Sequence, residues 1–200
     1  MKTMHKGALA ALCGLATATV ALAQQQPRMP PSTTQATGTY DQHAGAMESE
    51  SRTNGAAAAA FVDKAAQAGM TEVQLGKLAL QKSSDAQIRK FAQQMVTDHS
   101  KAGEELAAIA KAENLQVPGK LDSKHADMVR ALGAKSGAAF DAAYAQGMMQ
   151  DHMQAVALFE GAQQLPEPAL AQFAAKTLPT LQEHKRMAQA LGAARVATSQ

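Results

Sequence analysis

The stretch FAQQMVTDHSKAGEEL, residues 91–106, decides the fold of this 200-residue chain. Its apolar residues recur at steps of three and four, the spacing that lines one face of an α-helix, and this stripe holds Ile88, Phe91, Met95, Ala102, Leu106 and Ile109. His99 falls on the same stripe. A ring on the core side of a helix has to be hydrogen-bonded, metal-bound or functionally perturbed, because a buried polar group without a partner costs free energy. The stretch therefore predicts a long helix that carries a histidine toward the core.

Similar stripes occur on both sides of this stretch. They predict long helices over about 56–82, 85–113, 138–163 and 168–193, with a short helix at 123–135 before the third long one. The chain is 46% hydrophobic but only 4% aromatic, which favours close-packed helices over sheets. The predicted fold is all-α, an antiparallel four-helix bundle with one extra short helix.

Local signals set the ends and the spacing of these helices. Asp85 is the predicted N-cap of the second helix, and Asp122 or Ser123 caps the short one. Gly69 and Gly76 weaken the first helix, by roughly 1 kcal/mol each relative to alanine. We expect them where a neighbouring helix approaches closely.

The N-terminus, MKTMHKGALAALCGLATATVALAQQQ, is typical of a secretory signal peptide over residues 1–23. It has a basic start, an apolar run and the small-x-small site Ala21-Leu22-Ala23. An uncleaved anchor is the alternative, but the run is short for a membrane span. Cys13 is the only cysteine and lies in this segment, so the mature chain has neither thiol nor disulfide. We expect a periplasmic or secreted protein, in some settings associated with the outer membrane, with no transmembrane segment after cleavage.

Three further segments follow. Residues 24–54 are rich in Gln, Pro, Thr and Ser with few large apolar residues, which predicts a disordered linker. The bundle domain is expected over 55–194, and the tail at 195–200 is expected to fray.

Charge excludes one class of partner. Without Lys2 and Lys6 of the signal segment, 17 basic residues balance 17 acidic ones. A near-neutral chain has no overall attraction for nucleic acid, and no basic stripe with interleaved aromatic residues is present. There is also no G-x-S-x-G setting and no phosphate-cradling glycine loop, which argues against hydrolase and nucleotide-binding functions.

One polar residue occupies the apolar stripe of each long helix: Glu72, His99, His152 and His184. Each lies well inside its helix, so antiparallel packing would bring the four side chains to similar depths. Imidazoles with one carboxylate suit a transition metal ion such as copper, zinc or iron. The alternative is a hydrogen-bonded polar network that fixes helix register without metal.

Three acids and three methionines accompany the histidines. Asp98, Asp151 and Glu183 precede the histidines by one residue, about 100° around the helix. They could accept a ring N–H from a neighbouring helix or form ion pairs at the helix seams, and we favour the seam for Glu183. The thioethers on the histidine faces are ordinary core filler, or soft ligands for copper(I): Met95, Met148 and Met187.

Four stretches carry a family resemblance. FVDKAAQAGMTEVQLGKLALQKSSD, KFAQQMVTDHSKAGEEL, SGAAFDAAYAQGMMQDHMQAVALFE and FAAKTLPTLQEHKRMAQAL, between Phe61 and Leu191, resemble the bacterial "domain of unknown function 4142" family. That family is described as predicted secreted or outer-membrane proteins. The resemblance implies a ferritin-like bundle and an exported compartment, but it implies no reaction.

The chain departs from di-iron bundles, which carry Glu-x-x-His on two helices. Three residues before the histidines this chain has Val96, Met149 and Leu181. The missing bridging carboxylates argue against an iron-oxidising ferroxidase and favour a histidine-rich mononuclear site.

These observations favour an exported metal-binding or stress-related bundle that is not an enzyme. Two alternatives stay open. One is a structural or interaction module, and the other is a metal-dependent oxidoreductase with an open coordination position. A partner in the envelope and a homo-oligomer are both compatible with the sequence.

Overall fold

The computed structural model describes the backbone of residues 40–198 and the side chains of residues 52–194. Within that part of the chain every regular element is a helix: α1 (Tyr40–Lys82), α2 (Ala86–Ala112), α3 (Ser123–Gly133), α4 (Gly137–Ala162) and α5 (Pro168–Thr198). The all-α prediction is confirmed, including the short helix before the third long one. The predicted signal peptide, residues 1–23, lies outside the described residues.

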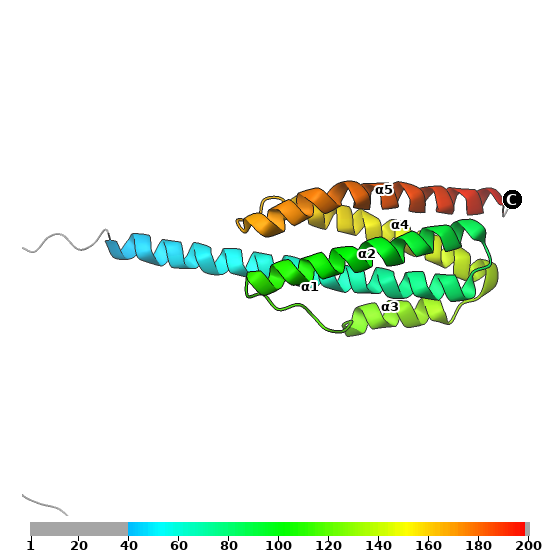
Figure 1. The fold of residues 1–200 in the computed structure, drawn as a ribbon, viewed down its shortest axis with the longest axis horizontal. Coiled ribbons are helices and arrows are strands. Elements are labelled where there is room, and N and C mark those ends of the chain that lie inside the picture. The colour runs from blue at the N-terminus through cyan, green and yellow to red at the C-terminus, as the bar shows by residue number, and fades with distance from the viewer. Residues whose placement is uncertain (1–39, 199–200) are drawn as a thin grey trace, which may run out of the picture. The chain divides into compact units, whose positions relative to one another are not determined.

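The four long helices form a bundle in which neighbours run antiparallel (Figure 1). Helix α1 packs along α2 and α4 along α5, while α1 against α4 and α2 against α5 close the ring. Helix α3 packs against α1 and α4. The loop after α2 and helix α3 carry the chain from the end of the bundle where α2 finishes to the end where α2 begins. Helix α4 starts there (Figure 1).

Helix α1 begins earlier than the sequence predicts. Residues 40–54, expected in a disordered linker, are helical, and Figure 1 shows this first part of α1 extending past the other helices. The chain contains no proline between Pro31 and Pro118. Because adding a residue to an existing helix costs far less than starting one, the alanine-rich run from Ala56 extends backward through it. Likewise α5 continues to Thr198, where a frayed tail was expected from 195.

Two predicted caps are present. Oδ1 of Asp85 accepts hydrogen bonds from the backbone N–H groups of Gln87 and Ile88, both at 2.9 Å. Oδ1 of Asp122 accepts one from the N–H of His125 at 2.8 Å. These carboxylates satisfy donors that have no partner within the helix.

The core consists of two hydrophobic clusters. The Phe61 cluster has its main aromatic contacts among Phe61, Phe159 and Phe173, whose ring centroids lie 5.2 to 6.5 Å apart. The Phe91 cluster includes Phe91 and Tyr144, with centroids 6.2 Å apart. On every long helix about two to three turns separate the buried residues of one cluster from those of the other. These turns carry the polar residues of the histidine layer: Glu72, His99, His152 and His184.

Of Gly69 and Gly76, only Gly76 marks a close helix contact. A Cβ at Gly76 would lie 2.8 Å from Cγ2 of Val96 and 3.0 Å from the backbone oxygen of Ala92, so α1 and α2 touch there. A Cβ at Gly69 would meet nothing within 4 Å. The expectation is thus correct for Gly76 and wrong for Gly69, which faces open space.

Gln67 holds the long loop after α2 in place. Its Nε2 donates to the backbone oxygen of Lys120 at 3.1 Å, and its Oε1 accepts from the backbone N–H of Asp122 at 3.0 Å. This buried amide therefore ties the start of α3 to α1. None of the described helices is both long enough and apolar enough to cross a membrane.

Candidate metal centre

Three imidazole rings meet in the middle of the bundle. The centroids of His99, His152 and His184 lie 5.3 to 5.6 Å from one another. One nitrogen of each ring comes within 4.8 Å of a nitrogen of the other two. His152 and His184 are 0% and 1% exposed, and His99 is 9% exposed. Helices α2, α4 and α5 thus bring together residues that are far apart in the sequence.

The hydrogen bonds of His152 define its tautomer. Its Nδ1 lies 2.8 Å from the backbone oxygen of Met148. A carbonyl only accepts, so Nδ1 carries the proton and Nε2 keeps a free lone pair. That Nε2 is buried and has no hydrogen-bond partner.

His184 is oriented by a carboxylate of another helix. Its Nε2 lies 2.9 Å from Oδ2 of Asp98, to which it donates, and its buried Nδ1 has no partner. The contact matches the orienting role considered for Asp98, because a ring N–H held by a carboxylate leaves the other nitrogen free to bind a metal.

His99 completes a set of three unpartnered nitrogens. Its Nε2 is buried and without a hydrogen-bond partner, like Nε2 of His152 and Nδ1 of His184. Each unsatisfied buried polar group costs about 1–3 kcal/mol. Three of them on adjacent rings are costly in a protein without a ligand, and the rings do not relieve one another by hydrogen bonding.

Burial also keeps the three rings neutral. Desolvation, helped by the neighbouring His152 and His184, lowers the pKa of His99 from 6.5 to about 3. Desolvation outweighs the bond to the Met148 carbonyl and lowers the pKa of His152 to about 4. The pKa of His184 is lowered by burial, although Asp98 partly offsets this. Neutral imidazole is the form that binds metals, so the cluster is ready to do so at neutral pH.

Glu72 lies beside the three histidines without belonging to the group. Its Oε1 is 3.5 Å from Nδ1 of His152, which faces the Met148 carbonyl, and its Oε2 is buried without a partner. The separation is that of an ion pair, but burial and the nearby Asp151 raise the pKa of Glu72 well above 4.5, while that of His152 is lowered. We therefore treat the contact as one between neutral groups.

The acids that directly precede the three histidines make different contacts. Asp98 contacts His184, as described above. Asp151 has a buried Oδ2 without a partner and a pKa raised by burial, and it acts on Glu72 through its charge. Glu183 forms an exposed ion pair with Arg186 on its own helix, and this pair does not join two helices.

The methionines pack as core residues. Met95 and Met148 are fully buried members of the Phe91 cluster, and Met187 packs against that cluster. Three imidazoles, those of His99, His152 and His184, are placed among the described residues so that they could hold one metal ion.

Tyr144 was not considered as a site residue from the sequence. Its hydroxyl is buried with no partner, and burial together with the nearby Glu72 raises its pKa. It lies two helical turns before His152, on the same face, and that spacing is the signal that could have identified it.

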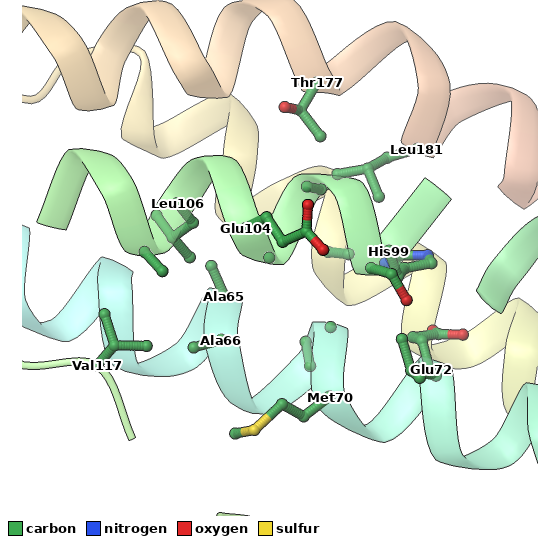
Figure 2. Close-up of a pocket in the computed structure, with 18 of the residues that line it drawn as sticks. Ala65, Ala66, Met70, Glu72, His99, Glu104, Leu106, Val117, Thr177 and Leu181 are labelled. Carbon is green, nitrogen blue, oxygen red and sulfur yellow. The ribbon is translucent and has the colours of Figure 1, made fainter. Parts of the chain in front are cut away.

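A pocket of about 540 Å³ leads to this layer from the α1–α2 side. Figure 2 shows Glu72 and His99 at one end of the pocket and Leu106 and Val117 at the other. His152 and His184 do not line it. The histidine cluster is therefore reached from the pocket by way of His99.

The arrangement can hold a metal after a small contraction. Ligands at about 2.1 Å from a tetrahedral ion lie roughly 3.4 Å apart, and the present separations reach 4.8 Å. The ring nitrogens would therefore have to approach one another by up to about 1.4 Å for one ion to bind all three. Three imidazole nitrogens would suit a four-coordinate ion whose fourth coordination position is not filled by the protein.

The chain belongs to the family described as "Domain of unknown function (DUF4142)", whose model matches residues 42–191. Among curated proteins, none matches it. It is similar in structure to the crystal structure of a DUF305 fragment from Deinococcus radiodurans, with a TM-score of 0.60 and 18% sequence identity, covering 68% of this chain and 95% of that one. At that identity the likeness shows the helical fold alone.

Proposed function

We propose that this member of the DUF4142 family binds one transition-metal ion through His99, His152 and His184, and that it handles metal in the cell envelope without catalysing a reaction. The observation that carries the proposal is the set of three buried, unpartnered ring nitrogens, one from each histidine. A bound ion would satisfy all three at once.

The ligand chemistry favours zinc or copper over iron. Three neutral imidazoles suit these borderline ions. Bridged di-iron sites need several carboxylates, and the histidine layer has one, Glu72. The thioethers Met95 and Met148 pack in a hydrophobic cluster, which removes support for a mixed His/Met copper(I) site.

One carboxylate behind a ligand supports a buried cation. Asp98 accepts a hydrogen bond from the His184 ring at 2.9 Å, whereas Glu72, 3.5 Å from the His152 ring, is neutral in the metal-free protein. A carboxylate in the position of Asp98 raises the basicity of the ligand and holds its ring in the binding orientation.

Export is part of the proposal. It rests on the signal-peptide pattern of residues 1–23. Expressing the full chain and measuring the mass of the protein in the periplasmic fraction tests it. A mature N-terminus near residue 24 supports export, and an intact Met1 in the cytoplasm contradicts it.

Elemental analysis of the exported protein, purified without tag or chelator, tests the metal site. We expect close to one zinc or copper per chain. We also expect at least a hundredfold weaker titration by the same ion for His99→Gln and His152→Gln. His125→Gln is the matched control, because His125 binds Asp122 outside the cluster.

The competing function is a polar core network without metal. It predicts no metal in the purified protein, no response to micromolar zinc or copper, and a lower melting temperature for His99→Gln. That combination would overturn the metal site.

A further inference from the structure

The pocket between α1 and α2 has the properties of a small-molecule site. Its volume of about 540 Å³ lies in the range of ligand pockets. Along α2 it extends from His99 to Ala107, about 12 Å at 1.5 Å per residue. It is therefore elongated along the helix axes.

Small side chains create this space. Gly69 and Gly103 line the pocket, and a Cβ added to either would meet no atom within 4 Å. Ala65, Ala66 and Ala102 line it as well. Most of the remaining wall is apolar, with Leu106, Phe159 and Phe173 among its residues, although polar residues also line the pocket: Gln74, Lys77, Ser100, Glu104 and Thr177.

Two buried polar groups lie at one end of the pocket. Oε2 of Glu72 and Nε2 of His99 both lack hydrogen-bond partners, and the two side chains are 3% and 9% exposed. Figure 2 shows them next to each other at the same end. A ligand with one hydrogen-bonding group at its tip would satisfy a donor or acceptor there that the protein leaves unsatisfied.

The charges on the pocket determine which ligands fit. Lys77 and Glu104 line it but are exposed, so their charges remain solvated. Glu72 and His99 are almost fully buried at this end of the pocket. A charged head group placed beside them would lose its hydration, whereas a hydroxyl group can both donate and accept a hydrogen bond to the unpartnered atoms there.

We propose that this pocket binds a neutral, chain-like alcohol, with its alkyl chain along α1 and α2 and its hydroxyl group at Glu72 and His99. The proposal goes beyond metal binding and does not require it. Both sites use Nε2 of His99, so an alcohol and a metal ion would exclude each other, and the experiment is done with metal removed.

The test is displacement of the neutral dye N-phenyl-1-naphthylamine from the full chain in the presence of a chelator. We expect 1-octanol to displace the dye at least tenfold more effectively than octanoate or octyltrimethylammonium at pH 7.5. Equal displacement by all three, or none by octanol, overturns the proposal.

Two variants locate the site. Gly69→Leu fills the pocket and should weaken octanol binding at least tenfold. Gly147→Leu, a similarly half-buried position on α4 outside the pocket with no atom within 4 Å of an added Cβ, is the matched control and should bind normally. Loss of binding in both variants, or in neither, contradicts the assignment.

Glu72→Met keeps the size of the side chain and removes its hydrogen-bonding group. We expect the preference for octanol over octanoate to shrink several-fold, with dye binding retained. An unchanged preference shows that Glu72 does not hold the hydroxyl group. Because metal is absent throughout, failure of the metal site leaves these results unaffected.

Discussion

Nε2 of His184 on α5 lies 2.9 Å from Oδ2 of Asp98 on α2, the residue directly before His99. One carboxylate thus links two of the three helices that supply the histidine cluster. We expect Asp98→Ala to weaken zinc or copper binding by about 10- to 100-fold, because the His184 ring loses the acceptor that orients it. Asp98→Asn, which keeps an acceptor but not the charge, should fall between Asp98→Ala and wild type. Glu183→Ala is the control, since Glu183 pairs with Arg186. Equal effects of the Asp98 and Glu183 substitutions in a metal titration would contradict the orienting role.

The metal-free protein should lose stability in mild acid. His99 and His152 have pKa values of about 3 and about 4 when folded, against an ordinary 6.5. A lowered pKa means that the unfolded chain binds protons first, so their contribution is complete above pH 6.5 and is lost as the pH falls toward 4. Urea unfolding of the Glu72→Gln variant with chelator at pH 7.5, 6 and 5 measures this, because that variant lacks the opposite contribution of Glu72. A free energy of unfolding that stays constant over the range would refute it.

The contribution of Glu72 to stability should depend on pH in the opposite direction to that of the histidines. Its raised pKa contributes stability below about pH 4.5 that is lost as the pH rises through the folded value. At pH 7.5 Glu72→Gln, which stays neutral, should therefore raise the free energy of unfolding of the metal-free protein. The gain should shrink toward pH 4.5. A destabilised variant at pH 7.5 would show that the carboxylate is ionised and paired in the fold.

Substitution by alanine should have opposite effects on stability at Gly69 and Gly76 of α1. Gly76→Ala places a methyl group 2.8 Å from Val96 and 3.0 Å from a backbone oxygen of α2, so we expect a loss of about 1–3 kcal/mol. Gly69→Ala meets open space and should stabilise α1 by about 0.5–1 kcal/mol. Thermal unfolding of both variants checks the pair, and equal shifts in melting temperature would contradict the helix contact at Gly76.

Much of the fold follows from local sequence because helix stripes, caps and turns are short-range properties. The stripe around His99, the cap at Asp85 and the cap at Asp122 each depend on residues within a turn or two. The start of α1 was misplaced because polar composition suggests disorder, whereas a helix that is already formed extends through a proline-free segment.

The candidate site was less accessible from the sequence. Periodicity places Glu72, His99, His152 and His184 on inner faces, and antiparallel order gives them similar depths. It does not specify how far each helix is rotated or how each side chain turns. Helix rotation and side-chain orientation decide that Glu72 lies outside the group of three histidines. They also place Tyr144 near Glu72.

The sequence by itself determined the helices, their inward faces and the presence of a polar layer in the core, because these depend on spacing along one chain. Only the tertiary structure decided which ring nitrogens remain unpartnered, which acid orients His184, and that a pocket ends at Glu72 and His99. These depend on contacts between helices, for example Asp98 with His184 across 86 positions of the sequence. Packing sets such contacts through the rotation and separation of whole helices, which no local pattern encodes.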